Sequence, residues 1–232
     1  QTVNGCESTN RTPVSVTLFP DSIGGSVNNG FTIPVCFGTN STVLNLTGQT
    51  GTVIKWQSAS DAAFSSNLID ISNTSTSYTV TNLTTSLYFR AVVQSGTAPV
   101  EFSIPAKIEV NALSIGGTLN SPNGPSSSVC KNENSGLLTL TGHVGTINRW
   151  EQSTDNGNIW TPIANTTNTY TSGPLTTTTQ YRAIVQNGVC SEAPSSVVTI
   201  PVKNTPIVTD IPNQEICFGE TKAFGESFIA NH

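Results

Sequence analysis

A segment that occurs twice is the feature that most constrains how this chain folds. Residues 36–56 read CFGTNSTVLNLTGQTGTVIKW, and residues 130–150 read CKNENSGLLTLTGHVGTINRW, with no gap between the two copies when they are aligned. The match continues downstream, where Tyr78 corresponds to Tyr170 after two extra residues in the first copy. Self-similarity over this length indicates that one small domain is present more than once.

The repeat predicts two complete domains, at residues 21–112 and 113–203. Residues 1–20 match the last hairpin of a preceding repeat, and residues 204–232 match the start of a following one, where the tripeptide Cys-Phe-Gly of the first copy occurs again. Because both ends agree with the internal copies, we interpret the chain as a window from a longer tandem array.

The pattern within each copy predicts short β-strands. Apolar residues alternate with polar ones, as in Leu44 and Leu46, and no long segment shows helical periodicity. Thr and other β-branched residues, which favour a pleated surface, are abundant. About seven such strands, with an early Trp and a late aromatic residue, predict an immunoglobulin-like sandwich.

The fold class we expect is therefore all-β, with tandem immunoglobulin-like β-sandwich domains arranged end to end. Four aromatic residues are expected in the two cores: Trp56, Trp150, Phe89 and Tyr181. Tyr181 is also placed to make a tyrosine-corner hydrogen bond, which Phe89 lacks the hydroxyl to make. The junctions contain no Gly/Ser run, and Pro206 stiffens the second, so a rod is predicted.

Several short motifs make the chain similar to a known group of proteins. They are Cys-x-Gly-x-Asn at 36–40, Leu-x-Leu-Thr-Gly at 44–48 and 138–142, Gly-Thr-x-x-x-Trp at 51–56 and 145–150, Ser-Thr-Asp-Asn-Gly-x-x-Trp at 153–160 and Tyr-Arg-Ala-x-Val-Gln-x-Gly at 181–188. With these, the chain resembles the Ig-like repeats of large secreted surface proteins of gliding Bacteroidetes-type bacteria, such as SprB-like gliding-motility adhesins and other type IX secretion cargo. The resemblance implies a filament or stalk at the extracellular cell surface, with no active site.

Composition argues against several function classes. Charged residues are only 10% of the chain and the net charge is −5, without a basic run, so nucleic acid is not an expected partner. No apolar stretch is long enough to span a membrane. With two histidines and no recurring carboxylate pair, we expect no catalytic residue, cofactor or metal site, and no enzyme activity.

The five cysteines indicate an oxidising, extracellular setting. The preferred disulfide joins Cys130 and Cys190, which belong to one repeat, and leaves Cys36 unpaired because Ala98 stands where the second copy has Cys190. The alternative joins the last cysteine of each repeat to the first of the next, giving Cys6–Cys36 and Cys190–Cys217. If Cys130 ends the first strand and Cys190 lies in the turn between the last two, a sandwich places them at opposite ends, farther apart than a disulfide can reach. Both patterns therefore stay open.

Two motifs have both a structural and a functional interpretation. Residues 153–160 fit the Asp-box pattern Ser-x-Asp-x-Gly-x-x-Trp, which favours a tight hairpin over a ligand surface. Arg90 and Arg182 point away from the core face, and Arg182 is expected near Glu151 and Arg149. A solvated cross-strand ion pair is favoured there, with a ligand-binding stripe as the alternative.

Other candidate sites depend on short patterns. Ser22, in Asp-Ser-Ile, fits a bacterial O-glycosylation pattern. Oxygen-bearing residues near the junctions are candidate Ca²⁺ ligands, although their irregular spacing does not favour a site: Asp21, Glu109, Asn111 and Asp210. Asn-x-Ser/Thr occurs at six positions, mostly by coincidence in so Thr-rich a chain: Asn10, Asn40, Asn45, Asn73, Asn82 and Asn165.

Two functions of different class follow from these observations. The first is a segment of a repetitive cell-surface adhesin or filament with weak, multivalent contacts to external surfaces or glycans, in gliding motility or attachment. The alternative is an accessory stalk or carbohydrate-binding module of a secreted hydrolase. The domains that flank such repeats in the parent protein distinguish the two.

Overall fold

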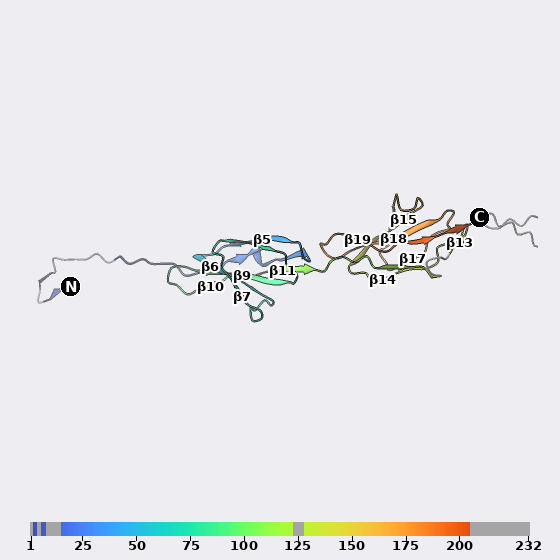
Figure 1. The fold of residues 1–232 in the computed structure, drawn as a ribbon. Coiled ribbons are helices and arrows are strands. Elements are labelled where there is room, and N and C mark those ends of the chain that lie inside the picture. The colour runs from blue at the N-terminus through green and yellow to red at the C-terminus, as the bar shows by residue number, and fades with distance from the viewer. Residues whose placement is uncertain (1, 4–5, 8–14, 123–127, 205–232) are drawn as a thin grey trace, which may run out of the picture. The chain divides into compact units, whose positions relative to one another are not determined.

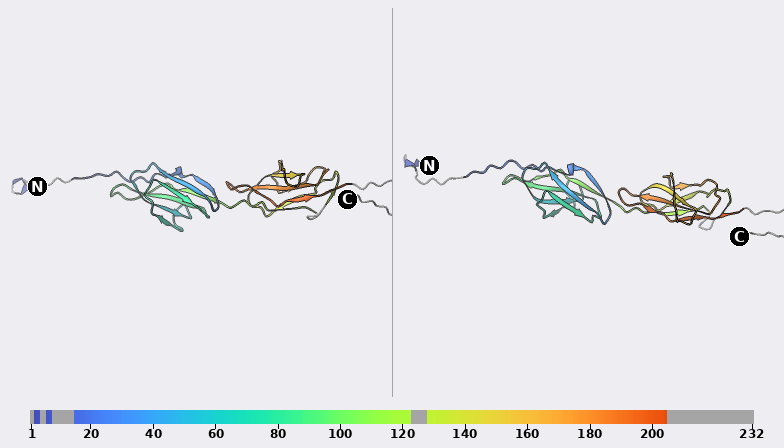
Figure 2. Two further views of the ribbon diagram at one scale, coloured as in Figure 1. Left: turned by 45° about the horizontal axis from the view of Figure 1, so that its top comes forward. Right: turned by 90° about the horizontal axis from the view of Figure 1, so that it is seen from above.

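The computed structural model describes residues 2–3, 6–7, 15–122 and 128–204 of the chain. The chain divides into two compact units (Figure 1). The first comprises Gln1–Leu113 together with Gly188–Cys190, and the second comprises Ser114–Asn187 and Ser191–His232. Within the described residues the fold is all-β, apart from one 3₁₀ turn, η1 (Asn28–Gly30). Figure 2 shows the strand arrows of both units from two further sides.

The first unit builds two sheets from one repeat. Its strands are β3 (Ser26–Val27), β4 (Thr32–Cys36), β5 (Ser41–Thr47), β6 (Thr52–Ala59), β7 (Ile69–Ile71), β8 (Ser77–Thr81), β9 (Leu87–Gln94), β10 (Glu101–Phe102) and β11 (Ala106–Asn111). One sheet has the order β3-β5-β8, and the other has the order β4-β11-β9-β6-β7, with β10 also paired to β9.

The second unit repeats this arrangement. Its strands are β12 (Thr118–Asn120), β13 (Val129–Cys130), β14 (Leu138–Thr141), β15 (Thr146–Ser153), β16 (Thr161–Ile163), β17 (Thr169–Tyr170), β18 (Thr179–Gln186), β19 (Ala193–Pro194), β20 (Val198–Ile200) and β21 (Val202–Lys203). One sheet has the order β12-β14-β17, the other β16-β15-β18-β19 with β20 on β18, and β13 pairs with β21.

The connectivity is that of an immunoglobulin-like sandwich. In each unit the strand that carries the Trp, β6 or β15, lies beside the strand that carries the late aromatic residue, β9 or β18, and both pairings are antiparallel. The first strand of the domain is split, so that β3 joins one sheet while β4 joins the other by running parallel to β11. This is the division into a three-strand sheet and a sheet containing the C, F and G strands that defines the fold.

The aromatic residues expected in the core are all buried. Trp56 and Trp150 are fully buried, and their indole Nε1 atoms donate to the carbonyl oxygens of Ser75 and Thr167, each at 2.9 Å. These tryptophans contribute a large apolar area, and the hydrogen bond satisfies their one polar group.

Each tryptophan belongs to a row of three rings that spans the sandwich. Trp56, Tyr78 and Phe89 have successive centroid distances of 5.9 and 6.2 Å. In the second unit the row is Trp150, Tyr170 and Tyr181, at 5.5 and 5.7 Å. The Tyr181 hydroxyl is buried and makes no hydrogen bond within the described residues, so the prediction of a tyrosine-corner hydrogen bond is wrong.

The Gly-Thr-x-x-x-Trp motif begins the Trp strand at a close backbone contact. Gly51 and Gly145 have φ values of 114° and 117°, and a Cβ on either would lie within 2.6 Å of the backbone of Gln94 or Gln186. Only glycine tolerates both conditions. A register shift follows directly in both copies, between Val53 and Lys55 in the first and at the matching place in the second.

At the start of the chain, β1 (Thr2–Val3) and β2 (Cys6–Glu7) pair antiparallel. The residues expected to open a following repeat, 204–232, lie outside the described residues apart from Asn204. The rod predicted from the short junctions stays a prediction.

Candidate functional site

The disulfide in this structure joins Cys36 to Cys190, with the Cα atoms 4.9 Å apart. Cys36 ends β4, where it is the register partner of Asn111 on β11. Cys190 lies in the turn after β18, and this turn, Gly188–Cys190, groups with the first unit in space. The Val189 backbone N–H donates to Asn111 Oδ1 at 3.3 Å, and Cys190 Sγ lies 3.2 Å from the Ala112 carbonyl oxygen. The turn is thus held beside the end of β11.

This bond corrects both predicted pairings. Cys130 is free and exposed, so the preferred Cys130–Cys190 bond does not form. The reason is distance: Cys130 lies beside Lys203, near the start of β18, whereas Cys190 follows the end of that eight-residue strand. Eight strand residues span roughly 26 Å, while bonded Cα atoms lie within about 7 Å of each other.

The alternative pairs, Cys6–Cys36 and Cys190–Cys217, are also wrong, because Cys36 and Cys190 are bonded to each other. Cys217 itself lies outside the described residues. This alternative correctly expects cysteines of adjacent repeats to pair, but it joins the last cysteine of one repeat to the first cysteine of the next. The first cysteine of one repeat bonds to the last cysteine of the next.

An arginine on β18 organises a polar cluster in the second repeat. Arg182 donates through Nε to Glu151 Oε2 at 2.7 Å, and its guanidinium carbon lies 4.0 Å from the centre of the Trp160 ring. Arg149 Nε donates to the other oxygen of Glu151 at 2.8 Å, and its Nη1 donates to Glu192 at 2.8 Å. The predicted proximity of Arg182, Arg149 and Glu151 is therefore confirmed.

The pair is not the solvated one that the sequence favoured, because Glu151 is only 6% exposed. Hydrogen bonds from Arg149 hold the pKa of Glu192 below its ordinary value, and the two carboxylates raise the pKa of Arg149. A carboxylate buried between two guanidinium groups has its acceptor sites occupied by protein. The polar groups of the cluster thus bond to one another, which argues against the ligand-binding stripe considered as the alternative.

The first repeat builds the same cluster from different residues. Arg90 donates through Nε to Gln57 Oε1 at 2.8 Å, and its guanidinium carbon lies 4.0 Å from the Phe64 ring centre and 3.9 Å from that of Phe102. Gln57 Nε2 in turn donates to Asp70, and so does Lys55. Burial lowers the pKa of Arg90, and the bonds from Lys55 and Gln57 lower that of Asp70.

The aromatic partners of these arginines were not identified from the sequence. The sequence did hold a signal for the polar partners, because Gln57 and Glu151 occupy matched positions of the repeat, and these lie directly opposite Arg90 and Arg182. Phe64 and Trp160 come from the hairpin after the Trp strand, whereas Phe102 lies on β10. That hairpin is two residues longer in the first copy, and this difference hides the correspondence between Phe64 and Trp160.

The Asp-box motif forms the hairpin between β15 and β16, as the structural interpretation predicted. Asp155 Oδ1 accepts from the Ser153 hydroxyl at 2.7 Å and from the Ile159 N–H at 2.9 Å. Asn156 and Gly157 have φ values of 61° and 84°, which suit such a turn. The Ile159 N–H and the Ser153 hydroxyl lower the pKa of Asp155.

Asp61 has the same role in the first repeat, although the motif is missing there. Its carboxylate accepts from the backbone N–H groups of Ala63, Ser65 and Ser66, and the Ser65 N–H is the leading cause of its lowered pKa. In both repeats one aspartate therefore collects the N–H groups of the loop that carries the stacking ring.

Ser22, the candidate O-glycosylation site, has a structural partner. Its Oγ accepts from the Ser95 N–H at 2.9 Å, and the matching Ser114 accepts from the Asn187 N–H at the same distance. Because the same contact recurs in the second copy, the structural role of Ser22 is to bind the turn that follows β9. Glycosylation of Ser22 stays a prediction.

The remaining candidates are dispersed or engaged. Within residues 15–122 and 128–204 no group of three or more His, Cys, Asp or Glu side chains is arranged to hold a metal ion. Of the candidate Ca²⁺ ligands, Glu109 pairs with Lys107 at 3.1 Å, and Asp210 lies outside the described residues. Among the sequons, Asn73 and Asn165 use their side chains to close the loops before β8 and β17.

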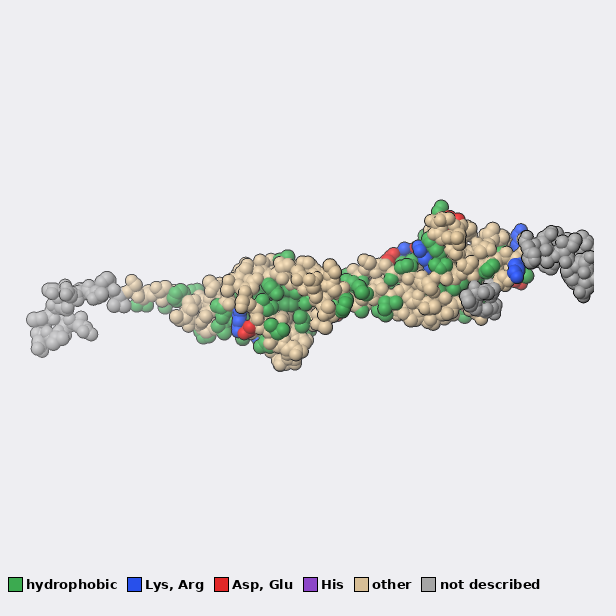
Figure 3. All heavy atoms as spheres, viewed as in Figure 1, with side chains coloured by type: hydrophobic (Ala, Val, Ile, Leu, Met, Phe, Trp, Pro, Cys, Tyr) green, Lys and Arg blue, Asp and Glu red, His purple; other side chains and the backbone are tan. Residues whose placement is uncertain are grey.

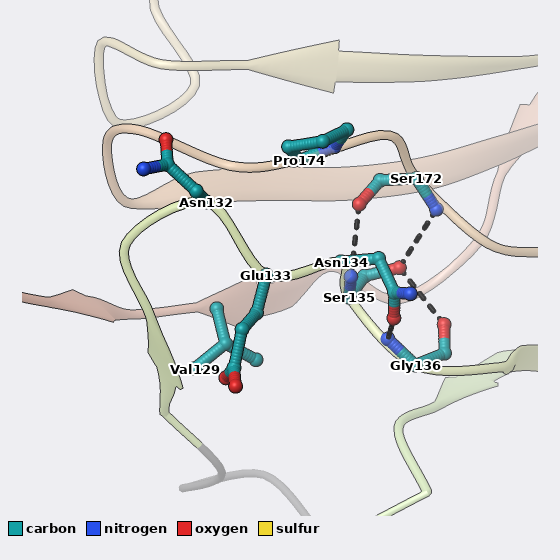
Figure 4. A pocket seen from close by; sticks show the side chains of 8 residues that line it. All are labelled: Val129, Asn132, Glu133, Asn134, Ser135, Gly136, Ser172 and Pro174. Carbon is teal, nitrogen blue, oxygen red and sulfur yellow. Dashed lines mark hydrogen bonds between the residues drawn. The ribbon is translucent and has the colours of Figure 1, made fainter.

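A pocket of about 470 Å³ is lined by residues that include Val129, Glu133, Ser135 and Ser172 (Figure 4). Ser135 and Ser172 face each other there and exchange N–H to hydroxyl hydrogen bonds of 2.9 and 3.0 Å. Glu133 is the one charged residue among those lining it, and it accepts from the Cys130 N–H at 2.9 Å. The serine hydroxyls donate to backbone carbonyls rather than to a base, so the arrangement does not resemble an activated nucleophile.

Comparison with protein families places the chain in one of them. The family described as Domain of unknown function (DUF8696) matches the chain twice, at residues 24–112 and 119–204. The chain belongs to this family. No curated protein sequence matches the chain significantly.

Similar solved structures include the fibronectin(III)-like modules of Clostridium thermocellum CbhA, at 15% identity and a TM-score of 0.36, covering 82% of this chain and 99% of that one. They also include the FN1–FN3 domains of chicken CNTN1, at 17% identity and a TM-score of 0.33, covering 79% and 67%. No helix in the described part of the chain is long and apolar enough to cross a membrane.

Proposed function

We propose that this chain is a segment of a repetitive cell-surface adhesin or filament, which acts as an extended stalk and makes weak, multivalent contacts with external surfaces or glycans. The domain organisation belongs to this proposal: repeats at 21–112 and 113–203, with the end of a preceding repeat at 1–20 and the start of a following one at 204–232. The resemblance to SprB-like adhesins extends the proposal to gliding motility or attachment and to type IX secretion.

The observation that carries the proposal is that two copies of one domain retain their framework and differ in their surface groups. The Trp core and the Gly-Thr-x-x-x-Trp close contact are the same in both. The arginine side chains on β9 and β18 are engaged within the protein. A domain whose polar groups are occupied by its own structure suits a spacer better than a catalyst.

The surface composition also supports this function. In the view of Figure 3 uncharged polar side chains and backbone cover most of the described surface, and charged groups are few. Such a surface is hydrated and offers little electrostatic steering, so that strength must come from many weak contacts. A disulfide in the fold supports an extracellular, oxidising location.

The test compares this chain with longer arrays of the same repeats on immobilised glycans and on solid surfaces. We expect the chain to bind weakly and the long arrays to bind firmly, and small-angle scattering to show an elongated particle. Tight, saturable binding of a small molecule by one repeat would overturn the proposal. A hydrolase domain beside the repeats in the parent protein would favour the accessory-module alternative.

A further inference from the structure

Cys130 in the second repeat occupies the position that Cys36 occupies in the first. In the first repeat the Phe37 N–H donates to the Asn111 carbonyl oxygen at 2.9 Å. In the second repeat the Lys131 N–H donates to the Lys203 carbonyl oxygen, also at 2.9 Å. Each cysteine ends a strand that runs parallel to the last strand of its repeat. The backbone that presents the sulfur is therefore the same in both copies.

The match extends to the next residue along the chain. Gly38 and Asn132 both have left-handed backbone, with φ values of 87° and 72°. Their N–H groups donate to the carbonyl oxygens of Leu83 and Leu175, at 3.1 and 2.7 Å. Glycine and asparagine are the residues that adopt this conformation most readily. Two different residues thus make the same bend after the cysteine.

The turn after β18 carries Cys190, and the turn after β9 is its counterpart in the first repeat; each is called the late turn of its repeat. The turn of the second repeat lies on Asn111, so closely that a Cβ on Gly188 would be 2.2 Å from Asn111 Oδ1. The turn of the first repeat lies on Phe19, where a Cβ on Gly96 would be 2.2 Å from the ring. Phe19 and Asn111 are matched residues, each two positions before the start of its repeat at 21 or 113. The residue that precedes a repeat therefore receives the late turn of that repeat, whether it is Phe or Asn.

Lys203 occupies the position that matches Phe19 and Asn111. It is the register partner of Cys130, just as Asn111 is the register partner of Cys36. We propose that Cys130 forms a disulfide with the cysteine in the late turn of a third repeat of the same type. This inference rests on the proposed tandem array but not on adhesion. It would hold equally for a stalk of a hydrolase.

The bond requires an oxidant. Two thiol S–H bonds are broken and one S–S bond forms, and two protons and two electrons pass to a low-molecular-weight disulfide, which is reduced to two thiols. Cys130 is exposed, so that it is accessible to such a disulfide. The disulfide also requires a cysteine in the late turn of the third repeat. Ala98 occupies that position in the first repeat, so a repeat of that kind cannot close the bond to the repeat before it.

The difference between Ala98 in the first repeat and Cys190 in the second is the basis of the experiment. A copy of residues 20–111 is inserted after Lys203 of the full chain, with the copied Cys36 changed to Ala. The test version also has Ala98→Cys in the inserted copy, and the control version keeps Ala98. Both proteins are equilibrated with oxidised and reduced glutathione, alkylated without reduction and mapped by mass spectrometry. The inserted Ala98→Cys peptide is unique, so its partner is identified unambiguously.

We expect a Cys130 peptide joined to the inserted cysteine in the test version, and a fully alkylated Cys130 in the control. The Cys36–Cys190 bond, present in both, reports that the original repeats have folded. Cys130 that is still alkylated in the test version, or is joined to Cys6 or Cys217, would overturn the inference. So would absence of the Cys36–Cys190 bond from the unmodified chain. A failed adhesion assay would leave this inference standing.

Discussion

The two repeats hold the same arginine in two different ways. In both, the guanidinium group lies 4.0 Å from a ring contributed by the hairpin after the Trp strand, Phe64 for Arg90 and Trp160 for Arg182. In both, its Nε donates to the residue directly opposite on that strand. The opposite residue is the amide Gln57 in the first repeat and the acidic Glu151 in the second, and each also bonds to a further charged side chain.

The comparison separates what the fold requires from what it tolerates. A planar cation over an aromatic ring recurs, because stacking covers the ring and leaves the guanidinium edge free to donate. The position of the negative charge does not recur, since Asp70 on the neighbouring strand supplies it in the first repeat. We expect the two repeats to respond alike to changes in the core and differently to changes in charge.

The largest expected effect is the same in both repeats. Trp56→Ala and Trp150→Ala each remove a fully buried ring and leave a carbonyl oxygen without its donor. Each should lower the free energy of unfolding of its own unit by about 3–5 kcal/mol. Urea unfolding followed by circular dichroism measures this. Ile159→Ala, at a side chain that is 70% exposed, is the control and should cost less than about 0.5 kcal/mol. Markedly unequal costs for the two tryptophans would break the comparison.

Loss of the disulfide should come next and should distinguish the cysteines. Cys36→Ala or Cys190→Ala opens a bond that spans 154 residues of sequence and should cost about 2–5 kcal/mol. Cys130→Ala, at an exposed free thiol, should leave the unfolding midpoint unchanged. Adding reductant should lower the midpoint of the natural chain to that of Cys36→Ala. Equal effects of Cys36→Ala and Cys130→Ala would contradict the assigned bond.

Exchanging the residues opposite the arginines tests the charge difference directly. Glu151→Gln gives the second repeat the amide of the first, but it removes the one charge that two arginines share. A loss of about 1–2 kcal/mol is expected. The reverse change, Gln57→Glu, places a carboxylate beside Asp70 and should also destabilise, by about 1 kcal/mol. Thermal unfolding of both variants at low and high salt is the measurement, and a gain in stability from either exchange would show that the clusters are interchangeable.

The smallest effects should come from the turn aspartates. The pKa values of Asp61 and Asp155 are both lowered from an ordinary value of 3.8, by N–H groups of their loops and by hydroxyls. A lowered pKa in the folded state means that the contribution to stability is present above pH 3.8 and is lost as the pH falls through the folded-state value. Unfolding midpoints measured between pH 7 and pH 2 should therefore fall less steeply in Asp61→Ala and Asp155→Ala than in the natural chain. A pH profile that either substitution leaves unchanged would refute the role given to that residue.

The sequence was sufficient for the features that depend on local pattern. The alternation of Leu44 and Leu46 with polar residues predicted which face of the strand is buried, because neighbouring side chains on a strand point in opposite directions. The Asp-box predicted a hairpin because its residues bond to one another within a few positions. The internal repeat doubled the strand signal, since both copies had to satisfy the same prediction, whereas the Asp-box occurs in the second copy only.

Only the tertiary structure decided which distant groups meet. The partner of Cys36 depends on where the turn at Gly188–Cys190 lies, and neither spacing nor count specifies that position. Phe64 and Trp160, which stack on Arg90 and Arg182, come from loops of unequal length, so sequence alignment alone does not match them. Strand patterns and turns result from contacts between near neighbours along the chain and are legible in the sequence. Disulfides and stacked cations join residues that are brought together only when the sheets have packed.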